Sequence, residues 1–198
     1  MMTINLHRIN LFVIVLCLIS FTGCKNSITS NFKIQKRGEA FKNFLEPGAR
    51  TIVLPLLTHR LAAFSPSLSS RALEGKIRLV RRNLPIIPFE EFLQAVADSG
   101  QENLFIETMN EFYDKGTVTR SAVKRLAGLM RAKDPRFLLL LRIEKVQAYK
   151  DASETHKRQL FVAGKLVALP EGEDALDFVC ATLATGTGET TTVAVPVL

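Results

Sequence analysis

The pattern of hydrophobic and polar residues divides the chain into three stretches. Residues 11–21 form an apolar run whose one polar member is Ser20. Residues 25–50 are polar and basic with scattered phenylalanines. From residue 51 onward, apolar residues recur with the periods of buried strands and amphipathic helices. We therefore expect a short hydrophobic signal, a tether and one folded domain.

The first half of the expected domain is mainly helical. The run TIVLPLL at 51–57 is apolar and rich in β-branched residues, which is typical of a buried strand. Ser65-Pro66 supplies the capping hydroxyl and first-turn proline of a helix start. A very short strand, LPIIP, is expected at 84–88. The expected helices cover about 66–83, 88–99, 102–115 and 117–132.

The second half predicts strands. FLLLLRIEKVQAY at 137–149 begins as a continuous apolar run and then alternates, which indicates a strand buried at one end and half exposed at the other. Further strands are expected at 157–169, at 175–185 and, after the turn TGTGE, at 190–198. Short polar loops between them favour an antiparallel meander. The predicted fold is a single α/β domain with a mixed or mostly antiparallel four- to five-stranded sheet packed by about four helices.

The first 24 residues have the parts of an export signal. Arg8 is the one charged side chain before Cys24, and the apolar run is shorter than the roughly 20 residues that span a bilayer. Phe21-Thr22-Gly23-Cys24 resembles the lipobox of bacterial lipoproteins, although Phe21 stands where leucine is usual. An ordinary secretory signal with a chance cysteine, or an uncleaved anchor, are the alternatives.

The lipobox resemblance implies that the chain is cut before Cys24 and that a lipid is attached to its thiol. Several acyl chains would anchor the protein firmly, because each buried CH2 contributes about 0.8 kcal/mol. The resulting division is a signal peptide at 1–23, a lipidated tether at 24–50 and an α/β envelope domain at 51–198.

The chain is basic, with 26 Lys and Arg against 19 Asp and Glu. One cluster is a candidate surface for an anionic partner such as lipid headgroups or an acidic protein. Its members are Arg71, Lys76, Arg78, Arg81 and Arg82. A second cluster consists of Lys124, Arg125, Arg131, Lys133 and Arg136. A solvated helix face is the alternative for both. Nucleic acid is not expected as a partner, because an exported protein rarely meets it and no recognition motif is present.

Residues with catalytic chemistry are scattered. His59 and His156 stand in polar loops without the spacing of metal ligands. Glu90 and Glu91 are adjacent, so on a helix they point about 100° apart and cannot face each other. Cys180 has apolar neighbours, and we expect it to be a small buried residue of a strand. We expect no enzyme activity, no metal and no cofactor.

From residue 51 onward, the order of patterns resembles a group of bacterial envelope proteins. The resemblance is carried by the stretches TIVLPLL, LPIIPFEEFLQAV and RFLLLLRIEKV, and by the turn TGTGE. The group includes the penicillin-binding-protein activator lipoproteins, the periplasmic domain of the curli secretion lipoprotein and the N-terminal domain of the Tol translocation protein. The resemblance implies an interaction module of the envelope, with no active-site residues to carry over.

These observations give one functional expectation and one alternative. We expect a lipid-anchored, non-enzymatic envelope protein that binds another envelope component in assembly, secretion or cell-wall work. The expected location is the outer membrane, facing the periplasm, and oligomers are compatible with this role. The alternative is a lipoprotein that holds a lipid or another apolar small ligand between its helices and its sheet.

Overall fold

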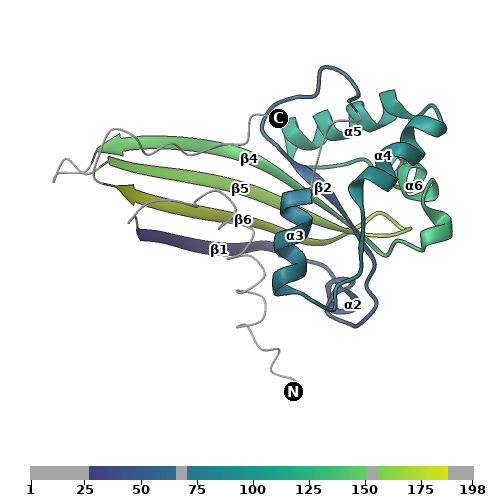
Figure 1. Ribbon diagram of the computed structural model, residues 1–198, viewed down its shortest axis with the longest axis horizontal. Coiled ribbons are helices and arrows are strands. Elements are labelled where there is room, and N and C mark those ends of the chain that lie inside the picture. The colour runs from purple at the N-terminus through teal and green to yellow at the C-terminus, as the bar shows by residue number, and fades with distance from the viewer. Residues whose placement is uncertain (1–26, 66–70, 151–155, 187–198) are drawn as a thin grey trace.

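A computed structural model describes residues 27–65, 71–150 and 156–186 (Figure 1). The strands in this part of the chain are β1 (Ser27–Arg37), β2 (Thr51–Leu57), β3 (Ile86–Ile87), β4 (Phe137–Lys150), β5 (His156–Ala168) and β6 (Glu173–Gly186). The helices are α2 (Phe41–Phe44), α3 (Arg71–Val80), α4 (Phe89–Asp98), α5 (Glu102–Lys115) and α6 (Arg120–Gly128), with a 3-10 turn, η1 (Arg131–Lys133). No helix within these ranges is long and apolar enough to cross a membrane.

All six described strands join one mixed sheet in the order β1-β6-β5-β4-β2-β3. The pairs β1–β6, β6–β5 and β5–β4 are antiparallel, whereas β2 runs parallel to both β3 and β4. The predicted single α/β domain with a mixed sheet is therefore confirmed. The expected count of four to five strands was too low, and the described part also holds five helices rather than four.

The additional strand is β1, which lies in the stretch expected to be a tether. In ITSNFKIQKR, Phe32 and Ile34 alternate with polar residues, and the Phe32 ring lies 5.2 Å from that of Phe178 on β6. The chain then leaves β1 at Gly38, where a Cβ would lie 2.2 Å from the carbonyl oxygen of Asp174. The folded part thus begins by Ser27 and not at residue 51. The mostly polar side chains of an edge strand concealed this pairing.

β1 also takes the position expected for the last strand. β6 is paired with β5 on one side and with β1 on the other, so a further hairpin partner has no free edge of β6 to join. Residues 190–198, for which a strand was predicted, lie outside the described residues.

Two hydrophobic cores lie on opposite faces of the sheet. One is formed with α4, α5 and α6 and includes Phe105, Phe112 and Leu140. The other is formed with α2 and α3 and includes Phe44 and Ile77. Residues 137–141 of β4 alternate between the two cores, and each is at most 3% exposed. The continuous apolar run at the start of this strand therefore reflects burial on both faces, as predicted.

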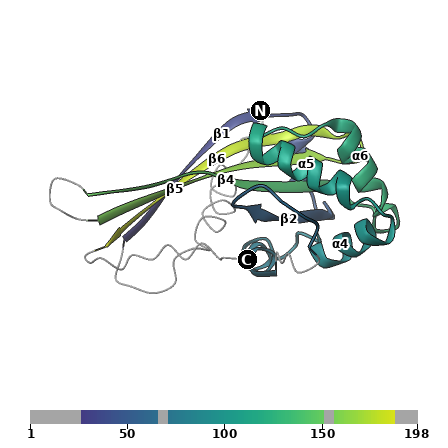
Figure 2. The ribbon, with the colours of Figure 1, turned by 90° about the horizontal axis from the view of Figure 1, so that it is seen from above.

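The sheet continues beyond its helical cover. The pairing of β2 with β4 ends at Leu57 and Arg142. Past this point, β4, β5, β6 and β1 extend together beyond the described helices as a four-stranded antiparallel ribbon (Figure 2). At its base Phe32 and Val162 still pack against the core of α2 and α3, and Leu160, Cys180 and Thr182 are buried. We call this ribbon the distal arm; it comprises residues 27–33, 143–150, 156–163 and 179–186. The predicted half-exposed end of the long strand is confirmed, since Val146 is 49% and Tyr149 is 45% exposed.

Candidate functional site

The first predicted basic cluster lies on α3 and directly after it. Arg71, Lys76 and Arg78 belong to the helix, and Arg81 and Arg82 follow its last residue. The helix is held to the sheet by Leu73 and Ile77, which are 8% and 1% exposed. This arrangement leaves Leu79 exposed by 68%, with Lys76 and Arg82 three residues to either side of it.

The guanidinium group of Arg71 already has a carboxylate partner. Its Nε lies 2.6 Å from Oε1 of Glu90, and its Nη2 donates to Oε2 at 2.8 Å. The hydrogen bond and the charge of Glu90 raise the pKa of Arg71, and the hydrogen bond from Arg71 lowers the pKa of Glu90. Glu91 instead pairs with Lys133 at 3.0 Å, so the two adjacent glutamates serve different partners. Arg71 is consequently a poor candidate for binding a further anion.

The other cations of the α3 cluster differ in how firmly they are held. Arg78 donates from Nη2 to the carbonyl oxygen of Ile86 at 3.2 Å. The Arg81 guanidinium lies over the Phe44 ring, 5.5 Å from its centroid. Lys76, Arg78 and Arg82 have no carboxylate partner within the described ranges. The α3 cluster thus offers three cations around one exposed leucine.

The second basic cluster does not form a single surface. Arg125 donates to Oε1 of Gln101 at 2.6 Å, and Lys133 is paired with Glu91. Arg136 lines a different pocket, together with residues of α2 and the end of β5. Since these three cations serve separate neighbours, the structure does not support one common binding face.

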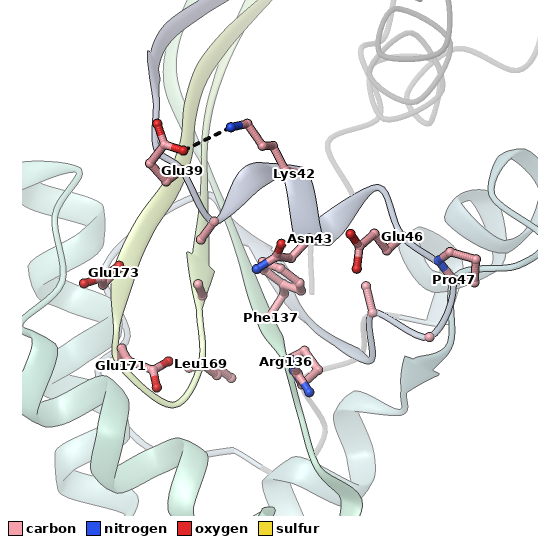
Figure 3. Close-up of a pocket in the computed structure, with 14 residues that line it drawn as sticks. Glu39, Lys42, Asn43, Glu46, Pro47, Arg136, Phe137, Leu169, Glu171 and Glu173 are labelled. Carbon is pink, nitrogen blue, oxygen red and sulfur yellow. Dashed lines mark hydrogen bonds and ion pairs between the residues drawn. The ribbon is translucent and has the colours of Figure 1, made fainter. Parts of the chain in front are cut away.

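The pocket beside Arg136 has a volume of about 750 Å³ and lies at the end of the sheet where β4 begins and β5 ends (Figure 3). Four glutamates line it together with Lys42, which pairs with Glu39 at 3.1 Å. These glutamates are Glu39, Glu46, Glu171 and Glu173. A second pocket, of about 360 Å³, lies between β3 and η1 and has Arg50, Glu91 and Lys133 in its wall. The larger pocket is lined mainly by polar residues, whereas the wall of the smaller one also contains Pro85, Ile86, Ile87 and Pro88.

The sequence interpretation missed a buried ionic group on β5 and β6. Lys165 has a side chain only 4% exposed, and its Nζ lies 2.7 Å from Oδ1 of Asp177 and 3.1 Å from Oδ1 of Asp174. Lys36 of β1 reaches Asp174 at 3.4 Å. Burial alone would raise the pKa of Asp174, but the hydrogen bonds and charges of Lys165 and Lys36 outweigh it, so the pKa lies below its usual range. A single lysine within an apolar strand was the available signal, because a buried cation requires an acidic partner.

The residues with catalytic chemistry that are scattered in the sequence are not brought together in the described part of the structure. Nδ1 of His59 lies 2.8 Å from the Thr58 hydroxyl on an exposed loop. Cys180 is 2% exposed, as expected for a small buried residue. Across the described ranges, no group of three or more His, Cys, Asp or Glu side chains is arranged to hold a metal ion. Cys24, the predicted lipidation site, lies outside those ranges, as does the side chain of His156.

Comparisons with known proteins give likenesses of fold alone. No protein-family model and no curated protein sequence matches the chain. Lipoprotein GNA1162 from Neisseria meningitidis aligns over 74% of this chain and 90% of its own, with 10% identity and a TM-score of 0.43. PelC, a dodecamer from Paraburkholderia phytofirmans, aligns over 86% and 88%, with 10% identity and a TM-score of 0.33. The hypothetical protein CT253 from Chlamydia trachomatis aligns over 68% and 72%, with 12% identity and a TM-score of 0.36. Likenesses at this level carry no statement about function.

Proposed function

We propose that the chain is a lipid-anchored, non-enzymatic protein of the bacterial envelope that binds another envelope component. In this proposal the lipid on Cys24 holds it to the outer membrane, and the folded domain faces the periplasm. The binding partner is a protein that offers an extended segment to the sheet.

The observation that supports this proposal is the outer edge of β1. β1 has 11 residues and pairs with β6 on one side, whereas no described strand pairs with its other side. Such an edge presents a row of backbone N–H and C=O groups to which an extended peptide can add by main-chain hydrogen bonds. The register of β1 shifts between Ile34 and Lys36, so the regular part of the edge runs from Ser27 to Ile34.

The charge on this edge indicates the kind of segment that fits. Lys33 and Arg37 are exposed, and β1 carries no acidic side chain. Lysines on an edge strand discourage pairing with a second copy of the same basic strand. An acidic extended segment from another protein has complementary charge and so fits better.

The alternative of a carrier for an apolar ligand gains no support from the packed core or from the larger pocket. The region between α4, α5, α6 and the sheet, where such a ligand was expected, is filled by side chains such as Phe89, Phe105 and Phe112, each at most 1% exposed. The pocket of about 750 Å³ is lined by carboxylates, which an apolar ligand would desolvate without compensation.

Site-specific photo-crosslinking in cells tests the proposal. A benzophenone amino acid replaces Asn31, an exposed residue on the regular part of β1, and a control replaces Glu107, an exposed residue of α5. We expect one envelope protein, identified by mass spectrometry, to be captured reproducibly from position 31 and not from position 107. Capture of the same proteins from both positions, or none from position 31, would contradict partner binding through β1.

Fatty-acid labelling tests the anchor separately. The full chain should incorporate the label, and Cys24→Ala should lose it. Label retained in Cys24→Ala would remove the lipid-anchor part of the proposal while leaving partner binding through β1 open to the crosslinking experiment.

A further inference from the structure

The lipid anchor and the first strand are almost contiguous in the chain. Only three residue steps separate Cys24 from Ser27, the first residue of β1. A fully extended chain covers at most about 3.3–3.6 Å per residue, so the two Cα atoms lie within about 11 Å of each other. If Cys24 carries the lipid, as in the proposed function, Ser27 must lie close to the headgroups.

Ser27 belongs to one transverse row of four strands. The register pairs Ser27 with Thr185, Thr185 with Lys157, and Lys157 with Tyr149. We call these four residues the tip row, because it lies at the free end of the distal arm (Figure 1). Adjacent strands are about 4.8 Å apart, so the whole row spans about 15 Å. A constraint on Ser27 therefore keeps Tyr149, at the other end of the row, within about 26 Å of Cys24.

The distal arm has the side chains that suit a headgroup layer. It carries five lysines or arginines, namely Lys33, Lys145, Lys150, Lys157 and Arg158. Within the four described ranges of the arm the one carboxylate is Glu144, which Arg142 engages at 3.1 Å, and the sequence that joins β4 to β5 adds Asp151 and Glu154. Tyr149, in the tip row, is 45% exposed, and tyrosine is enriched where membranes meet water. Each basic residue near an anionic leaflet favours binding.

The basic side chains lie on both faces of the arm. Arg158 shares a face with Val162, which packs against the core of α2 and α3. Lys157 is adjacent in the strand and so points to the opposite face, the one covered elsewhere by α4, α5 and α6. Cations on both faces fit an arm that meets a surface end-on, because one that lies flat would direct half of its charges away from the lipid.

The α3 cluster is the competing membrane surface, and chain geometry disfavours it. Ile77 of α3 packs in the same core as Leu139 of β4. Toward the tip this core ends at Phe32 and Val162, each five residues from the tip row, or about 17 Å along a strand. With the tip row at the headgroups, an upright arm therefore holds α3 about two Debye lengths, each about 8 Å, from the lipid charges.

From these observations we infer that the tip row rests on anionic phospholipid headgroups, with the strands upright on the membrane. This inference rests on the proposed lipid anchor at Cys24. It also defines the orientation of the protein on the membrane. The pocket beside Arg136, at the start of β4, faces away from the membrane. The edge of β1 then runs outward from the lipid surface and is accessible along its length.

Photo-crosslinking to lipid tests the orientation in the lipidated full-length protein. The protein is reconstituted into vesicles of phosphatidylethanolamine and phosphatidylglycerol, and the same preparation is checked for fatty acid on Cys24. A benzophenone amino acid replaces Tyr149 in one variant and Leu79 in the other. Both positions are exposed, by 45% and 68%, so each variant is expected to fold. We expect phospholipid adducts from position 149 and only background from position 79.

Each other outcome overturns the inference. Adducts from position 79 at or above the yield from position 149 would show that the α3 face lies against the membrane. No adduct from either position, with Cys24 lipidated, would show that the arm stands clear of the headgroups and would leave the proposed anchor intact. Absence of fatty acid on Cys24 would reject the anchor, and the inference would fail with it.

Discussion

The two halves of β4 place the same strand in opposite environments. Residues 137–141 are buried between two layers of helices, and each is at most 3% exposed. Beyond Arg142, Glu144, Lys145, Val146 and Tyr149 are all exposed. Because backbone pairing with β5 continues through both halves, the buried half fixes the position of the exposed one. The core thereby supplies stability, while the arm extends the sheet away from it.

The largest contrast is expected from truncating one apolar side chain in each half. Leu140→Ala removes a side chain that is 0% exposed and should lower the free energy of unfolding by about 3–4 kcal/mol, from lost burial and the cavity left behind. Val146→Ala, at a residue 49% exposed, should change it by about 0.5 kcal/mol or less. Chemical denaturation of both variants measures the difference. Equal losses would show that the arm contributes to the core and is not an external surface.

A smaller effect is expected from the buried ion group at the base of the arm. Lys165→Met keeps the volume of the side chain but leaves Asp174 and Asp177 without their shared cation. Because those carboxylates are 34% and 22% exposed, water offsets part of the cost, and we expect a loss of about 1–3 kcal/mol. Lys36→Met is the matched control, since the Lys36 side chain is 63% exposed and its pair should contribute about 0.5 kcal/mol or less.

The pH dependence of that loss follows from the lowered pKa of Asp174. A carboxyl whose pKa is lower in the folded state stabilises the fold above its unfolded pKa of about 3.9. That contribution is lost as the pH falls through the folded pKa. The gap between wild type and Lys165→Met should therefore be full at neutral pH and narrow below about pH 4. A gap that stays constant into acid would show that Lys165 acts through packing alone.

The sequence was sufficient for elements whose burial leaves a periodic pattern. The strands at β2, β4, β5 and β6 and the helices α4 and α5 were expected near their observed bounds because their apolar residues face a core. β1 lacked that signal, since pairing through its backbone demands little of its side chains. The strand register also leaves no signal in the sequence. The residue types of Ser27 and Tyr149 do not show that they lie in one row with two strands between them.

The candidate site was predictable only in part, for a related reason. The α3 cluster was found because its cations are close in the sequence. Whether each is free depends on residues far along the chain, as the pairing of Arg71 with Glu90 shows. The sequence did not predict the distal arm as a basic surface. Its lysines and arginines come from β1, β4 and β5 and are brought together only in the folded sheet. The proximity of charges in the sequence thus favoured the α3 cluster, which the inferred upright arm would hold away from the lipid.

The smallest expected effect compares these two basic surfaces on anionic vesicles. Lys157→Gln removes a cation from the tip row, and Lys76→Gln removes one from α3. One basic residue near an anionic surface contributes about 1 kcal/mol, so Lys157→Gln should weaken binding about fivefold, while Lys76→Gln should change it less than about twofold. The rate at which the lipidated full-length chain dissociates from phosphatidylglycerol vesicles measures both, because the lipid on Cys24 that orients the arm is kept. The difference should shrink as salt is raised, because exposed charges are screened beyond about 8 Å at physiological ionic strength. The reverse ranking would assign the membrane surface to α3, and the upright arm would have to be abandoned.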